Sequence, residues 1–526
     1  MTVTSTRPVD GTAVRTAEAL ADLDNPCYVV RTAAGIAVTG QPPRGDGELL
    51  AAVGPLPPAR LGGASGFVAA HGVAYPYMAG AMANGIASEE LVIALARVGC
   101  LASFGAAGLL PERIEAALRR FDAEISGLPR ACNLIHSPSE SGLERAAVQL
   151  FLTHGVDRVE ASAFMDLTPH VVRYRVAGLR RDRSGAVRAD NRLLAKVSRE
   201  EVAVRFMRPP PPEMLRGLVE DGLVTAEQAE LARLVPMADD VTVEADSGGH
   251  TDRRPLTVLL PGVLALRERL AAETGHRVRV GAAGGIGTPE AAAAAFAMGA
   301  EYIVTGSVNQ ACVESGTSDA ARRMLAEAGA ADCDMAPAAD MFELGVQLQV
   351  LRRGTLFPMR ARRLYELYRT YDSVDDLPAV ERTRLEQQIF RRPLTRVWQD
   401  TVDYFERRDP EQLARAADNP KRRMALIFRW YLGMGSRWAK TGDPDREPDY
   451  QVWCGPAMGA FNAWTSGTYL EQPGNRRVAD VALHLMHGAA YTRRVGHLRD
   501  LGVHLPPTCT GYRPTRPHPR LSGVTA

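Results

Sequence analysis

The residues most able to do chemistry are a lysine, an asparagine and a histidine, each in or just beyond a short apolar run. Asn133 and Lys196 lie inside such runs, and His250 follows two glycines. A buried ammonium group is costly without a partner. We therefore expect Lys196 to contact an anion or an electron-rich ring, or to form a salt bridge with Glu160 or Asp246. His250 can act as acid or base near neutral pH. Turn formation by Asn133 and a structural hydrogen bond by His250 stay open as simpler interpretations.

Two glycine-rich turns predict a phosphate site. Gly284 and Gly285 follow one apolar run, and Gly306 and Ser307 follow the next. If both runs are parallel strands, the N–H groups at their carboxyl ends can bind one anion. A lone glycine turn often serves only close packing, but two in tandem favour a ligand that carries phosphate.

The apolar runs alternate with helical patterns over about 250 residues, a length typical of one barrel. The runs cover residues 75–80, 101–105, 131–135, 158–162, 193–197, 241–245, 278–283 and 301–304. Eight strands in alternation with helices predict a (β/α)₈ TIM barrel. Functional groups of such barrels lie just past the carboxyl ends of the strands, which is where the candidate residues fall.

Small residues after the first strand leave room for a flat ligand against the backbone. Together with the phosphate site, they favour flavin mononucleotide (FMN). In this interpretation, the N–H groups of Ala81 and Met82 face N5 and O4 of the ring. Asn133 and Lys196 bond the pyrimidine edge, and Gly249 lies beside the cofactor. The two glycine turns then bind its phosphate.

Length and composition set bounds on the class of protein. The 526 residues are 46% hydrophobic and 23% charged, which is ordinary for a soluble enzyme. A formal net charge of +1 gives no reason to expect nucleic acid or a membrane as partner. The seven cysteines include no CxxC pair, so neither a zinc site nor a disulfide framework is expected. No signal peptide or run of about 18 apolar residues is found, which predicts a cytoplasmic protein.

The chain is expected to divide into five regions. They are an amino-terminal appendage and linker (1–66), the barrel (67–335) with a helical insertion at about 205–238, a helical cap (336–450), a segment that packs back on the barrel (451–505), and a disordered tail (506–526). Within them we expect a linker or wrapping arm over 41–66, a helix that begins at Pro261 and helical structure over 341–351. The residues 450–454 read as strand-like.

These motifs resemble a known family. They are MAGAMANGIAS, CNLIHSP, VEASAFM, VEADSGGHTD, GAAGGIGTP, TGSVNQ, DMFELGVQLQVLRRGTLFPMRARRLYELY and VWCGPAMGAFNAW. The chain resembles the PfaD-like trans-acting enoyl reductases of polyunsaturated fatty acid and polyketide synthases over about residues 70 to 500. That family belongs to a wider group of flavin barrels with the nitronate monooxygenases, in which a glycine usually stands two residues after the histidine. Asp252 stands there in this chain.

The resemblance implies a two-stage reaction. NADPH reduces FMN, and hydride then passes from the flavin to Cβ of an α,β-unsaturated acyl thioester while a proton reaches Cα. His250 is the candidate proton donor or carbonyl polariser. Two alternatives stay open: nitronate oxidation with His250 as base, and a non-catalytic barrel that binds a synthase. The resemblance leaves open whether the reductant is NADPH or NADH. It also leaves open whether the protein is a monomer or a homodimer.

The predicted cap is basic. Between residues 341 and 440, Lys and Arg number 20, and Asp and Glu number 13. With the family resemblance, this excess favours docking of an acidic acyl carrier protein that delivers the enoyl thioester. A plain solvated helical face is the simpler interpretation. Charge reversal at Arg362 and Arg363 is expected to weaken activity on carrier-bound substrate more than on a small thioester.

Overall fold

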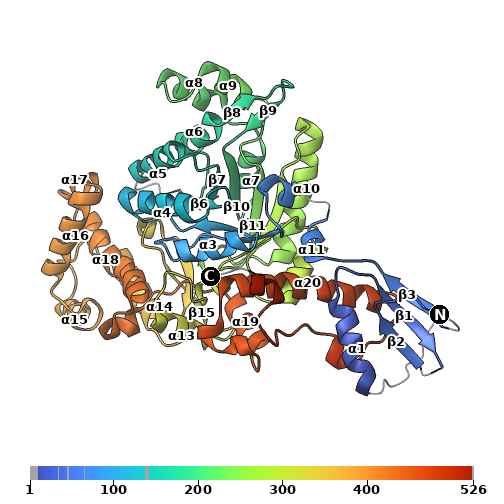
Figure 1. Ribbon diagram of the computed structural model, residues 1–526. Coiled ribbons are helices and arrows are strands. Elements are labelled where there is room, and N and C mark those ends of the chain that lie inside the picture. Colours follow the sequence, from blue (N-terminus) through green and yellow to red (C-terminus); the bar gives the residue numbers. More distant parts are fainter. Residues whose placement is uncertain (1–9, 34, 44–46, 64–65, 137–140, 524–526) are drawn as a thin grey trace.

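A closed barrel of eight parallel strands is the centre of the molecule. The computed structural model describes residues 10–33, 35–43, 47–63, 66–136 and 141–523. Around the barrel the strand order is β10-β11-β13-β14-β4-β5-β6-β7, which confirms the predicted (β/α)₈ fold (Figure 1). The strands are β4 (Tyr77–Ala79), β5 (Leu101–Phe104), β6 (Ala131–Ile135), β7 (Arg158–Ser162), β10 (Arg192–Val197), β11 (Asp240–Glu244), β13 (Arg279–Ala283) and β14 (Ile303–Thr305).

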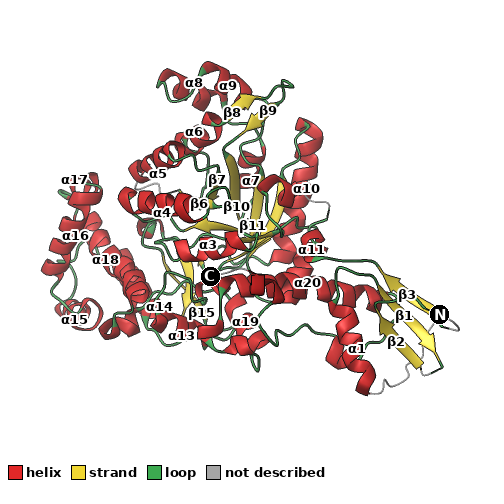
Figure 2. Ribbon diagram, viewed as in Figure 1, coloured by secondary structure: helices red, strands yellow, loops and turns green. Residues whose placement is uncertain are grey.

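Helices cover the outside of the barrel (Figure 2). They are α3 (Glu89–Arg97), α4 (Pro111–Glu124), α5 (Ser141–Thr153), α6 (Pro169–Ala177), α7 (Glu200–Met207), α10 (Leu256–Thr274) and α11 (Pro289–Ala297). The predicted start of a helix at Pro261 is wrong, because α10 begins at Leu256 and Pro261 lies inside it. The proline removes only one hydrogen bond in the first turns. Burial of Leu260 and Val263 in the same helix offsets that loss.

Two short additions interrupt the barrel pattern. The predicted helical insertion is present as α8 (Pro212–Glu220) and α9 (Ala226–Ala232), and Thr225 caps the second helix. A hairpin of β8 (Leu179–Arg181) and β9 (Val187–Ala189) was not predicted.

The amino-terminal appendage contains α1 (Asp10–Ala21) and a sheet in the order β2-β1-β3. Its strands are β1 (Cys27–Thr32), β2 (Gly35–Thr39) and β3 (Glu48–Val53). The prediction of a linker or wrapping arm over 41–66 missed strand β3. Buried Arg494 joins this appendage to the rest of the molecule, because it donates to the carbonyls of Asp22 and Asn25 at 2.6 and 2.7 Å.

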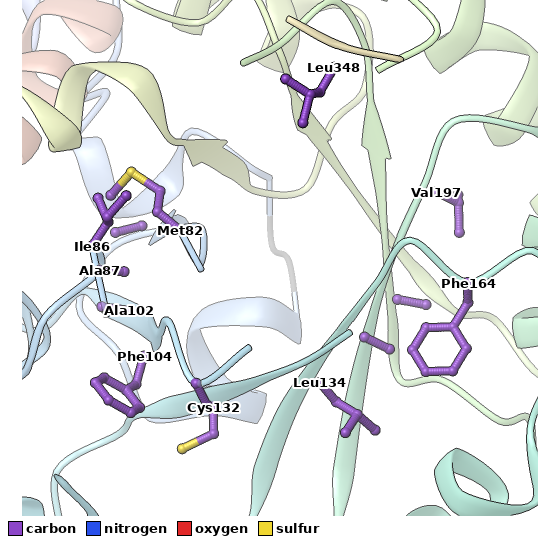
Figure 3. Packing of buried hydrophobic residues seen from close by; sticks show 14 of the residues in the cluster. Met82, Ile86, Ala87, Ala102, Phe104, Cys132, Leu134, Phe164, Val197 and Leu348 are labelled. Carbon is purple, nitrogen blue, oxygen red and sulfur yellow. The ribbon is translucent and has the colours of Figure 1, made fainter. Parts of the chain in front are cut away.

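A small sheet lies over the barrel where helix was expected. Residues 341–351 form a 3-10 turn, η2 (Phe342–Leu344), and then strand β16 (Gln347–Leu351), so the predicted helix is wrong. Gly345, with φ of 72°, ends the turn, and β16 pairs with β15 (Cys333–Pro337) on one edge and β12 (Gly249–His250) on the other. Leu348 of β16 belongs to the same buried cluster as barrel residues such as Leu134 (Figure 3).

The cap is a group of helices beside the barrel, drawn in orange in Figure 1. It contains α14 (Phe357–Thr370), α15 (Ala379–Arg384), α16 (Leu394–Arg408), α17 (Glu411–Ala416) and α18 (Pro420–Thr441). Part of its positive charge serves internal packing. The guanidinium carbon of Arg423 lies 4.7 Å from the ring centre of Trp398, and that of Arg392 lies 5.0 Å from Trp430.

The carboxyl-terminal part returns to the barrel through α19 (Ala457–Thr465) and α20 (Val478–Asp500), and α20 packs on α11. The strand-like residues 450–454 form only an isolated bridge, from Trp453 to Val350. The predicted disordered tail is ordered through Gly523. His518 is buried there, and Arg520 donates to the hydroxyl of Tyr75 at 2.5 Å.

None of the helices in the described part of the chain is long and apolar enough to cross a membrane.

Candidate active site

A cleft of about 1630 Å³ opens at the carboxyl ends of the barrel strands, between the barrel, the small sheet and the cap. Every site residue predicted from the sequence lines this cleft. They are Ala81, Met82, Asn133, Lys196, Gly249, His250, Gly284, Gly285, Gly306 and Ser307. The barrel therefore brings together residues that are spread over more than two hundred positions of the sequence.

Lys196 lies between two carboxylates. Its Nζ is 3.1 Å from Oε1 of Glu244 and 4.0 Å from Oε1 of Glu160, and its side chain is 16% exposed. Burial alone would lower the pKa of Lys196, but the two carboxylates outweigh burial and raise it. The ammonium group is therefore charged at neutral pH. Of the two predicted partners, Glu160 is correct, whereas Asp246 instead accepts from Gln349.

His250 lies on β12, the short strand that leaves the barrel after β11. Its Nε2 is 3.2 Å from Oδ1 of Asp340, and its side chain is 28% exposed. Burial lowers the pKa of His250, but the hydrogen bond and charge of Asp340 raise it further, so the net shift is upward. The same contact lowers the pKa of Asp340 against the opposing effect of burial. The pair favours the protonated imidazole, and Nδ1 has no hydrogen-bond partner among the described residues.

We call the two glycine turns, residues 284–285 and 306–307, the glycine cradle. Gly284 and Gly285 have φ of 85° and 71°, which glycine adopts without strain. A Cβ at Gly284 would lie 2.6 Å from the carbonyl carbon of Ala245, whereas nothing lies within 4 Å of a Cβ built at Gly306. Among the described residues, the N–H groups of Gly284, Gly285, Gly306 and Ser307 have no recorded hydrogen-bond acceptor. Four donors therefore remain for a ligand.

The first strand end differs from expectation. The N–H of Ala81 donates to Oε2 of Glu160 at 2.8 Å. This N–H is therefore already paired within the protein, and the prediction that it bonds to a flavin is wrong. The N–H of Met82 has no recorded acceptor in the described part of the chain, and it remains as the donor at this position. Asn133 lines the cleft and donates through Nδ2 to Ser162 at 3.1 Å and to the carbonyl of Glu160, and its side-chain oxygen accepts no hydrogen bond from the described residues.

The small sheet and the returning segment fix the loop that carries His250. Nε2 of Gln349 on β16 donates to Oδ1 of Asp246 and to the carbonyl of Ser247, both at 2.8 Å. The N–H of Gly455 donates to Oγ of Ser307 at 3.1 Å. Gln349 and Gly455 thus fix both the loop that carries His250 and the turn at Ser307.

These groups suit FMN. Unpaired backbone donors at two neighbouring strand ends match a phosphate. Space over Gly306, a free N–H at Met82, an amide oxygen at Asn133 and the charged Lys196 match the polar edge of a flavin ring.

Sequence reasoning missed several roles. Glu244 and Asp340 set the charge of Lys196 and His250, and Gln349 fixes the loop. The position of Glu244 at a strand end was a usable signal. Asp340 and Gln349 gave none, because their partners lie about 90 to 100 residues away.

The cap residues predicted to dock a carrier lie elsewhere. Arg362 binds Asp334 at 2.7 Å and Arg363 binds Glu381 at 2.9 Å, and neither lines the cleft. The cations of α16 and α18 that do line it are Arg407, Arg408, Arg429, Arg437 and Lys440.

Comparison with known proteins identifies the family of the chain. The chain is 37% identical to the enoyl reductase domain of MlnA from the macrolactin cluster of Bacillus amyloliquefaciens, with a TM-score of 0.79 over 83% of this chain and 98% of that one. The chain belongs to the PfaD-like family of enoyl reductase domains. It is 53% identical to a polyunsaturated fatty acid synthase protein of Thraustochytrium sp. over 84% of this chain, and 44% identical to the polyketide biosynthesis protein PksE of Bacillus subtilis over 81%.

The PfaD-like chain spans 30% of the length of the Thraustochytrium protein and 55% of PksE. Within the cap, residues 371–450 match the family of the inserted helical domain of [acyl-carrier-protein] S-malonyltransferase. The chain is thus an enoyl reductase-like domain of the kind found in polyunsaturated fatty acid and polyketide synthases, with an added helical unit.

Proposed function

We propose that this protein is an FMN-dependent, trans-acting enoyl reductase that uses NAD(P)H to reduce the α,β-double bond of enoyl thioesters on an acyl carrier protein. The observation that carries the proposal is the close structural likeness to the MlnA enoyl reductase domain, with His250 and Asp340 at the same cleft as the glycine cradle. The match of the cap to a domain of a carrier-dependent malonyltransferase supports an acyl carrier protein as partner.

The chain's own residues would hold and orient the cofactor. Gly284, Gly285, Gly306 and Ser307 would bind the phosphate through backbone N–H groups, and Lys196 would bond the pyrimidine edge of the ring. When bound, FMN accepts hydride from a reduced nicotinamide and delivers it to an acceptor. Glu160 and Glu244 would keep Lys196 charged and in place.

His250 would supply the proton. When Cβ of the enoyl thioester receives hydride, negative charge develops on Cα and on the thioester oxygen. An imidazolium near that charge stabilises the transition state more than the ground state. Because Nε2 bonds to Asp340, Nδ1 is the atom that would donate to the oxygen or to Cα.

Anaerobic mixing tests this function. The purified protein is reduced with NADPH, and crotonyl thioester of pantetheine is then added while the flavin absorbance is followed. We expect bleaching by NADPH and recovery with the crotonyl compound, and no recovery with the saturated butyryl thioester as control. Absence of bound flavin, or recovery that requires oxygen instead of the enoyl thioester, would contradict the proposal.

A further inference from the structure

Positive side chains from the barrel and the cap lie at the side of the cleft that the loops after β4 and β5 form. Arg113 of α4, Arg408 of α16, and Arg437 and Lys440 of α18 all line it there. The loops that follow β4 and β5 form this part of the rim, whereas the glycine cradle follows β13 and β14. In Figure 1, α4 is the barrel helix that lies beside the orange helices of the cap.

Two of these cations reach the same pair of loops. Nζ of Lys440 donates to the carbonyl of Asn84 at 2.5 Å, and Nη1 of Arg408 donates to the carbonyl of Gly108 at 3.3 Å. The loops are joined, because the N–H of Asn84 donates to the carbonyl of Ala107 at 2.7 Å. The ammonium and guanidinium groups therefore converge on one short stretch of the cleft rim.

The geometry of these loops admits little change. Asn84 has a φ of 59°, which is uncommon for a residue other than glycine, and Gly108 has a φ of 81°. A Cβ at Gly108 would lie 2.2 Å from Oδ1 of Asn84. The two loops that accept hydrogen bonds from Lys440 and Arg408 are therefore held in one backbone conformation.

The positive charge at this rim is only partly neutralised. Glu89 binds Arg113 at 2.5 and 2.9 Å. Arg437 is exposed on the cleft, one turn before Lys440 on the same face of α18, and no carboxylate pairs with it in the part of the chain that the structure describes. Burial, and to a lesser extent the charge of Arg113, lower the pKa of Lys440, and Glu89 opposes this effect.

We propose that Lys440 and Arg437, with Arg408 and Arg113, form a second phosphate-binding site that holds a phosphate ester of a substrate in the cleft. Converging ammonium and guanidinium groups suit phosphate oxygens. This inference rests on the proposed function, in which two ligands carry such esters: the phosphopantetheine arm of the acyl carrier protein and the nicotinamide dinucleotide.

The first arm of the test compares two substrates that differ by one phosphate. Steady-state kcat/KM is measured for crotonyl-pantetheine and crotonyl-4′-phosphopantetheine with the holoenzyme. Hydrogen bonds to charged groups predict that the wild type prefers the phosphorylated compound by roughly 10- to 100-fold. We expect this ratio to fall to about 3 or less in Lys440→Gln and to fall in the same direction in Arg437→Gln.

Arg369→Gln is the matched control, because Arg369 is an exposed cap arginine on α14 that does not line the cleft. Its ratio is expected to equal that of the wild type. The side chain of Arg437 makes no hydrogen bond or ion pair among the described residues. Arg437→Gln therefore tests the site even if Lys440→Gln folds poorly.

The second arm measures the KM for NADPH and NADH in the same variants. A rise of roughly tenfold in either KM, with an unchanged ratio for the two thioesters, assigns the site to the dinucleotide instead of the pantetheine arm. If neither the ratio nor the dinucleotide KM changes in Lys440→Gln and Arg437→Gln, the phosphate site is wrong.

Binding without turnover separates this inference from the proposed function. Equilibrium dialysis of 4′-phosphopantetheine and of NADP⁺ against the holoenzyme measures affinity directly. If the wild type reduces no enoyl thioester, the proposed function fails. Tighter binding of either probe to wild type than to both variants would still support the site, and equal binding of both probes would overturn it.

Discussion

The barrel contains an ion cluster at each end, and the two differ in whether a ligand can reach them. Strand β11 contributes to both, with Asp240 at its start and Glu244 at its end. At the amino end, Asp240 binds Nε2 of His71 at 2.9 Å and Nε of Arg279 at 2.6 Å. At the carboxyl end, Glu244 binds Lys196.

The cluster at the amino end does not reach the cleft. The side chains of Asp240 and His71 are both 0% exposed, and none of the three residues lines the cleft. Burial raises the pKa of Asp240, but His71 and Arg279 more than offset this and hold it at about 2. The carboxylate of Asp240 is paired on both oxygens within the protein, so the cluster joins β11, β13 and helix α2 (Gly66–His71).

The cluster at the carboxyl end faces the cleft. Lys196 and Glu244 line it, and the sheet formed by β12 and β16 adds His250 beside them. Charges in this cluster are paired and yet accessible to a ligand. The comparison predicts that changes at the two ends separate into effects on folding and effects on chemistry.

The largest effect is expected at His250. His250→Ala should keep its flavin but lose about 10²- to 10⁴-fold in turnover of crotonyl thioester, because a positioned proton donor is removed. Flavin absorbance and kcat are measured on the same preparation. Loss of flavin with normal turnover per bound flavin would mean that His250 is not the proton donor.

Asp240→Asn should show the opposite pattern. Removal of one partner from a buried ion cluster costs about 3–5 kcal/mol of unfolding free energy, while turnover per folded, flavin-loaded molecule stays normal. Denaturant unfolding gives the first value. Asp240 has a depressed pKa, so its contribution is present above about pH 4 and is lost as pH falls through about 2. A wild-type advantage that does not shrink on acidification would contradict this account.

Gly306→Ala tests the cradle at the open end. The added methyl group enters the space above Gly306 and should weaken FMN binding by about 10- to 100-fold through loss of a hydrogen bond to phosphate. Since no atom of the protein lies within 4 Å of that methyl, the unfolding temperature of the flavin-free protein should not change. Equal flavin affinity in variant and wild type would exclude Gly306 from the phosphate site.

The smallest effect is expected from Asp340→Asn, as a shift in pH dependence. Asp340 raises the pKa of His250, and activity that needs protonated His250 falls as pH rises through this pKa. Without the carboxylate the pKa falls, so activity should decline at lower pH than in wild type. A profile of kcat/KM against pH measures this. An unmoved alkaline limb would show that Asp340 does not control the protonation of His250.

Much of the fold followed from local patterns. The barrel strands are short apolar runs buried on both faces, and Thr288 and Pro289 mark the start of α11. The helical spacing of apolar residues gave the wrong prediction for β16, because pairing with β12 and β15 makes this segment a strand. It also failed for the tail, where contacts of His518 and Arg520 with other parts of the chain order residues that composition marked as disordered.

The sequence by itself determined the barrel and the positions of Lys196, His250 and the glycine turns at strand ends, because strand periodicity and glycine turns are local properties. Only the tertiary structure decided the partners. In the barrel Lys196 pairs with Thr242 of β11, and Glu244 lies two residues further along that strand, on the same face. Asp246 lies beyond the end of the strand and accepts a hydrogen bond from Gln349 instead. Asp340 reaches His250 because β12 and β16 pair across about 100 residues, a contact that no local pattern specifies.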